Sequence, residues 1–123
     1  MTVKPSTRRA HAEVVRSDVR AIVGRLNDVL GAAVVADLAG SKDSKSSYRW
    51  ARPDGTQPKD DSIRRLLFAH LQWLEISRTY GEDAARNWFI SANPLLGYAT
   101  PVDAIRNDRF RQTSIAAQTM LSE

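Results

Sequence analysis

The feature that most restricts the fold of this chain is the spacing of its apolar residues, which is helical rather than strand-like. Between about residues 11 and 30 the apolar positions are separated by steps of four, three, four and three: Val15, Val19, Ile22, Leu26 and Val29. These steps place one apolar stripe along a helix, and Gly31 follows as a stop signal. The stripe needs a surface to pack on, which is either the core of the same domain or a second copy of the chain.

Further helices follow, each delimited by a capping residue, a glycine or a proline. We expect them at about residues 32–39, from Asp43 or Ser44 to 51, at 60–79, at 82–90, from Pro101 behind the capping Thr100, and from 108 onwards. Trp50 is expected to be a buried anchor. The predicted apolar face of the long helix contains Ile63, Leu66, Leu67, Leu71 and Leu74, with Phe68, Trp73 and Ile76 beside it. No strand is predicted, so the expected fold class is all-α, a compact helical protein.

The residue inventory argues against catalysis and against a bound metal or cofactor. The 123 residues include no cysteine, and the two histidines, His11 and His70, have no acidic or histidine neighbours at ligand spacing. The adjacent carboxylates of Asp60 and Asp61 suit the start of a helix better than paired acid–base chemistry. No nucleophile elbow or phosphate-binding glycine loop is present. We therefore expect no enzyme and no cofactor.

Charge and hydropathy give two further expectations. No apolar run approaches the length of about 18 residues that spans a membrane, and the N-terminus has no signal-peptide core, so a cytoplasmic protein is expected. The net charge is +4; residues 1–80 hold 14 Lys and Arg against 9 Asp and Glu, whereas residues 81–123 hold 4 against 5. The basic excess in the front part favours a polyanionic partner, although solvated charge on an ordinary domain gives the same composition.

The segment 32–52 has the order of a helix-turn-helix, with a polar and basic second helix. In such a motif the second helix enters the DNA major groove, where Lys and Arg neutralise phosphates and hydroxyl groups contact phosphate or base edges. The alternative is a surface helix with solvated charges. The candidate DNA-binding residues are Lys42, Ser44, Lys45, Ser47, Tyr48, Arg49 and Arg52.

The second unusual segment is the strap 91–105, SANPLLGYATPVDAI, which is apolar and carries two prolines and a glycine. A stiff connection loses little entropy when it binds another molecule. Leu95, Leu96 and Tyr98 are therefore either core residues that fold the C-terminal helices back or an exposed protein-binding ridge.

The stretch NWFISANPLLGYATPVDAIRNDRF resembles the toxin-binding domain of the Xre/MbcA/ParS antitoxin family. The family pattern is an aromatic residue, then N-x-x-L-x-x-x-x-P-x-D-x-(I/L), a turn and a last helix; the matching positions are Trp88, Asn93, Leu96, Pro101, Asp103, Ile105 and the turn 106–108. Upstream, Arg49, Trp50, Gly55 and Pro58 match the end of the family's Xre-like helix-turn-helix. The family's usual glycine in the turn is Asn107 here, a residue type that also adopts the left-handed conformation.

The resemblance implies a non-enzymatic antitoxin that binds a RES-domain, NAD-consuming toxin, covers its NAD pocket and represses its own promoter, as a homodimer or in a larger complex with the toxin. A stand-alone helix-turn-helix transcriptional regulator is the alternative. The implied domains are a flexible basic arm at 1–10, the Xre-like domain at 11–80 and the toxin-binding domain at 81–123. The implied toxin-binding residues are Trp88, Asn93, Leu96, Tyr98, Phe110, Arg111, Ser114, Ile115, Gln118, Met120, Leu121 and Glu123.

Overall fold

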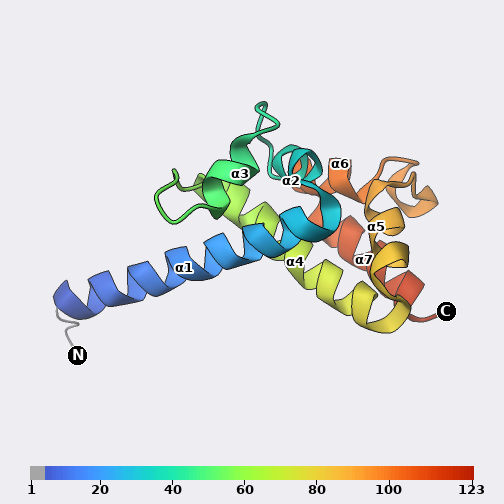
Figure 1. The fold of residues 1–123 in the computed structure, drawn as a ribbon. Helices are drawn as coiled ribbons and strands as arrows, with labels where there is room; N and C mark the ends of the chain where they lie inside the picture. Colours follow the sequence, from blue (N-terminus) through green and yellow to red (C-terminus); the bar gives the residue numbers. More distant parts are fainter. Residues whose placement is uncertain (1–4) are drawn as a thin grey trace.

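The computed structural model describes the backbone of residues 5–123 and the side chains of residues 15, 16 and 18–123. Over this part of the chain the elements are helical, which confirms the all-α class, and no strand occurs (Figure 1). Their bounds are α1 Pro5–Leu30, α2 Ala32–Leu38, α3 Ser46–Ala51, α4 Asp60–Tyr80, α5 Glu82–Ile90, the 3₁₀ helix η1 Pro94–Leu96, α6 Pro101–Arg106 and α7 Phe110–Leu121.

The long helix α1 packs on the rest of the protein through its C-terminal half, and its N-terminal half projects from the body (Figure 1). It begins at Pro5, not near residue 11, so residues 5–10 of the expected flexible arm are helical; residues 1–4 lie outside the described part. The buried positions are Val19, Val23, Leu26 and Leu30. This stripe is rotated from the predicted one, because Val23 and Leu30 face the core while Val15 lies on the projecting part and is exposed.

The main hydrophobic cluster joins the parts that the sequence analysis separates at residue 80. Leu26 of α1 and Leu66 of α4 lie in the same buried cluster as Phe89, Ile105 and Ala117 from the C-terminal segment. The predicted boundary therefore does not coincide with a division of the core.

The central helix α4 packs on this core through only part of its predicted apolar face. Leu66, Ala69, Trp73 and Ile76 are buried, whereas Leu67 is 44% exposed and Leu71 is 51% exposed. The prediction that Leu67 and Leu71 lie on the packed face is wrong. The buried face is the one that carries Leu66, Ala69, Trp73 and Ile76, which follow each other at helical spacings of three and four residues.

Several breaks between helices follow the local signals in the sequence, but α3 begins at Ser46 behind Lys45, without the side-chain cap expected from Asp43 or Ser44. Gly31 and Gly81 have φ angles of 90° and 93°, which suit glycine, and each separates two helices. Thr100 caps α6, since its side-chain oxygen accepts a hydrogen bond from the amide of Asp103 at 3.1 Å. In the turn after α6, Asn107 keeps a φ of −95° and the left-handed conformation falls on Asp108 instead, at 61°. No helix in the described residues is both long and apolar enough to cross a membrane.

Candidate functional site

The first candidate surface lies around α3, and one of its expected members is inside the protein. Ser47 is fully buried; its Oγ donates a 2.6 Å hydrogen bond to the carbonyl oxygen of Ala32. Its own carbonyl oxygen accepts from the side-chain amide of Asn27 at 3.0 Å. Ser47 therefore ties α3 to α1 and α2, and the prediction that it contacts DNA is wrong for this arrangement. Trp50 is buried beside it, as predicted.

The remaining expected residues of this surface are accessible. Arg49 is half-buried and pairs with Asp43 at 2.8 Å; the exposed ones are Lys42, Ser44, Lys45, Tyr48 and Arg52. The amide of Lys45, followed by the Arg49 guanidinium, holds the pKa of Asp43 below its ordinary value, so a carboxylate sits among the basic groups. The connection 39–45 between α2 and α3 is longer than the three to four residues usual in a helix-turn-helix.

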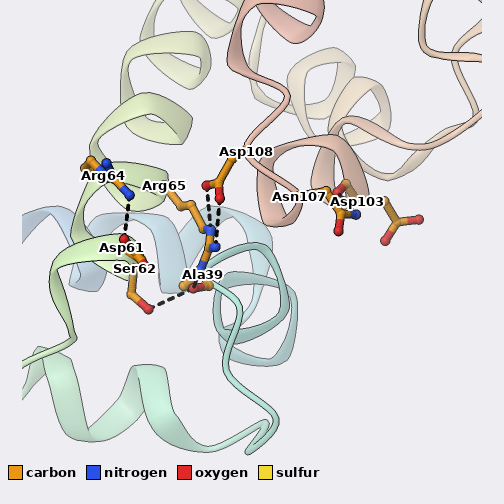
Figure 2. Close-up of polar contacts among 8 residues, drawn as sticks. All are labelled: Ala39, Asp61, Ser62, Arg64, Arg65, Asp103, Asn107 and Asp108. Carbon is orange, nitrogen blue, oxygen red and sulfur yellow. Dashed lines mark hydrogen bonds and ion pairs between the residues drawn. The ribbon is translucent and has the colours of Figure 1, made fainter.

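Arg65 of α4 links this front region to the C-terminal helices (Figure 2). Its Nη1 donates to the carbonyl oxygen of Ala39 at 3.0 Å, and its Nε and Nη2 donate to the Asp108 carboxylate at 3.0 and 3.1 Å. Ser62 Oγ donates to the same Ala39 oxygen at 2.8 Å. The bonds to Ala39 satisfy a carbonyl at the end of α2. The hydrogen bond from Arg65 is the main cause of the lowered pKa of Asp108. Neither Arg65 nor Asp108 is a candidate in the sequence analysis, because residues 43 positions apart give no local signal of pairing.

The strap contains both core residues and exposed residues, so each of the two alternatives for this segment holds for part of it. Leu96 is buried against Ala104 and Ala116, so it is a core residue, and the prediction that it contacts a partner is wrong. Asn93 holds the strap, since its side-chain oxygen accepts from the amide of Leu95 at 2.9 Å. Leu95 is 52% exposed, and Tyr98 is also exposed. The strap therefore packs through one leucine and presents the next.

The last helix, α7, also divides into a packed side and a free side. Thr113, Ala116 and Ala117 are buried. Phe110 stacks on Phe68 with ring centroids 4.8 Å apart, so it holds α7 to α4 and is not free for a partner. Met120 and Leu121 are partly buried against the core, and Ser114 is half-buried. The accessible expected residues are Arg111, Ile115, Gln118 and Glu123, and Ile115 is 54% exposed.

Two hollows meet on the free side of α7 and form what we call the tail surface. One, of about 390 Å³, is lined by Trp88, Asn93, Pro94, Leu95, Ala116, Thr119, Met120 and Glu123. The other is lined by Ser114, Ile115, Gln118, Thr119, Ser122 and Glu123. The sequence analysis missed Thr119, which the helical spacing of four from Ile115 indicates. The indole nitrogen of Trp88 is buried without a hydrogen-bond partner. This arrangement offers apolar packing with a polar rim, as protein-binding surfaces do.

The titratable groups show no convergent cluster in the described part of the chain. No group of three His, Asp or Glu residues there is placed to hold a metal ion. His70 lies beside α1, and desolvation, followed by the charges of Arg25 and Arg78, lowers its pKa. The side chain of His11 lies outside the described residues.

Comparison of the chain with protein-family models, with curated proteins and with solved structures finds no match. The fold therefore defines the class, an all-α protein, and the function is argued from the surfaces themselves.

Proposed function

We propose that this chain is an antitoxin that binds and blocks a RES-domain, NAD-consuming toxin through its tail surface. The observation that carries the proposal is the free side of α7, where the exposed Ile115 lines one hollow and the exposed Leu95 of the strap lines the neighbouring one. Exposed apolar side chains that are grouped together and rimmed by polar residues mark protein-interaction sites. The resemblance of the segment 88–108 to antitoxins of the Xre/MbcA/ParS family supplies the class of partner.

The strap explains why such a surface would bind without large reorganisation. Asn93 fixes the 3₁₀ turn, Pro94 and Pro101 restrict the backbone, and Leu96 is locked in the core. The exposed Leu95 is thus held in one place before a partner arrives, which reduces the entropy lost on binding.

A search for a RES-type toxin gene beside this one, followed by co-expression of the two proteins, tests the proposal. Ile115→Asp places a charge in the centre of the tail surface, and we expect it to abolish both co-purification with the toxin and protection of the cell. Tyr48→Asp is the matched control, since Tyr48 is a large exposed residue on α3, and it should protect like wild type. Full protection by Ile115→Asp, or the absence of any RES-type neighbour, contradicts the proposal and favours the stand-alone regulator.

We propose promoter DNA as the ligand of the α3 surface. The favourable feature is the group of exposed basic side chains Lys42, Lys45 and Arg52 around the exposed Tyr48. Lys45→Ala should weaken binding to the upstream DNA and reduce the slope of log affinity against log salt by about one, because each phosphate contact releases counterions. Ser44→Ala, which removes no charge, should leave that slope unchanged. Wild-type binding without salt dependence contradicts this assignment.

A further inference from the structure

Leu67 and Leu71 form an exposed stripe on α4, and Leu74, which packs partly against the core, continues its line. Leu67 and Leu71 are about half exposed, and Leu74 is partly buried beside them. Their spacing of four and three residues places them on one line along the helix, on the side away from Leu66 and Ala69. In Figure 1, α4 runs along the lower edge of the body, where α1 crosses it.

The same line continues into charged residues at both ends of the helix. Spacings of three and four lead from Leu67 back to Arg64 and Asp60, and from Leu74 forward to Arg78, and all three are exposed. Arg64 pairs with Asp61 at 2.5 Å, whereas Asp60 and Arg78 make no ion pair within the described residues. Asp60 and Arg78 lie about 27 Å apart at the rise of an α-helix, so they do not pair with each other in one chain.

We propose that a second copy of this chain covers the stripe, with the two α4 helices antiparallel. When Leu67 of one copy faces the partner's Leu71, the same alignment sets Asp60 opposite the partner's Arg78. By symmetry each of these contacts forms twice, as in any isologous two-fold interface. Arg64 then lies over the partner's Leu74, where its aliphatic stem covers the leucine while its guanidinium stays paired with Asp61 of its own chain.

A second copy is the occupant that the charge order selects. When the second α4 helix runs antiparallel, the acidic end of the stripe at Asp60 meets the basic end at the partner's Arg78; when it runs parallel, like charges meet. Antiparallel helices also place their dipoles in a favourable orientation. A single pair of helices buries less than a standard interface, so we expect a dissociation constant on the order of a micromolar. The stripe shares no residue with the tail surface or with the α3 surface, so this inference goes beyond the proposed function.

Sedimentation equilibrium of the full chain at concentrations on both sides of a micromolar tests the proposal. Wild type should pass from monomer to dimer, and Leu71→Asp should stay monomeric throughout. Ile90→Asp is the matched control, because this isoleucine at the end of α5 is similarly exposed and belongs to none of the surfaces named above, and it should dimerise like wild type. Circular dichroism checks that each variant keeps its helices, which we expect because the substituted side chains are exposed.

Charge reversal tests the antiparallel alignment. Asp60→Arg and Arg78→Asp should each weaken the dimer by at least about tenfold, because two attractive pairs become repulsive. An equimolar mixture of these two variants, or the double variant, should restore wild-type affinity, which loss of folding would not allow. Four results would overturn the proposal. The wild type could be monomeric, or the dimer could survive Leu71→Asp. The dimer could be lost on Val15→Asp alone, or the stripe could bind only a different protein.

Discussion

The buried hydroxyl of Ser47 gives the sharpest test of how α3 sits in this protein. Ser47→Ala removes a 2.6 Å hydrogen bond to Ala32 from a fully buried site and leaves a void the size of one oxygen atom. The carbonyl of Ala32 lies in the first turn of α2 and keeps its helical amide partner, so it is not left without a hydrogen bond. The loss is therefore that of one net hydrogen bond, about 1 kcal/mol of the free energy of unfolding.

A change of this size should lower the melting temperature of a domain of this length by about 4 °C. Calorimetry together with denaturant titration measures it. Ser44→Ala is the matched control, since it is the same substitution on an exposed residue three positions earlier, and it should change the free energy of unfolding by less than about 0.5 kcal/mol. If Ser47→Ala is as stable as Ser44→Ala but weakens binding to upstream DNA, then Ser47 contacts DNA and the reasoning from burial is refuted.

Three further predictions follow from single contacts. Thr100→Ala should cost about 1 kcal/mol in denaturant titration, because α6 loses its cap. Since Arg65 lowers the pKa of Asp108 below its ordinary 3.8 in the folded chain, this carboxylate stabilises the protein above that pH, and its contribution is lost as the pH falls through the folded-state pKa. Asp108→Asn should thus be less stable than wild type at neutral pH, and unfolding curves at decreasing pH should converge below 3.8. Gly40→Ala should cost about 1–2 kcal/mol, because its φ is 87° and the new Cβ would lie 2.4 Å from Arg65, whereas Gly24→Ala in open space within α1 should stabilise the protein in the same calorimetry.

The Arg65 contacts also bear on how the two proposed surfaces relate. Arg65 joins the end of α2 to Asp108 in the turn before α7, and the core is continuous across the same region. The α3 surface and the tail surface therefore belong to one packed body. Substitutions at Arg65 are expected to disturb both surfaces together, so they do not serve to separate the two proposed activities.

The candidate site was predictable from sequence only in part, and particular residues explain why. The sequence analysis places Ile115 and Tyr98 among the partner-binding residues, and both are exposed. It also includes Leu96 and Phe110, which are held by Ala116 and by Phe68. A leucine in a strap has the same hydrophobicity whether it anchors the strap or meets a partner, so its role depends on which neighbour reaches it first in space.

The sequence by itself determined the all-α class and most of the places where helices begin and end; the start of α1 at Pro5, instead of near residue 11, is an exception. Gly31, Gly81, Thr100 and Pro101 act on their own backbone, through conformations and hydrogen bonds that span at most a few residues. Only the tertiary structure decided which side of each helix is buried. The hydroxyl of Ser47 bonds a carbonyl 15 residues away, and Leu67 and Leu71 of α4 face solvent whereas Ala69 faces the core. These outcomes follow from contacts between helices, and a periodic pattern that fits several rotations of a helix cannot specify such contacts.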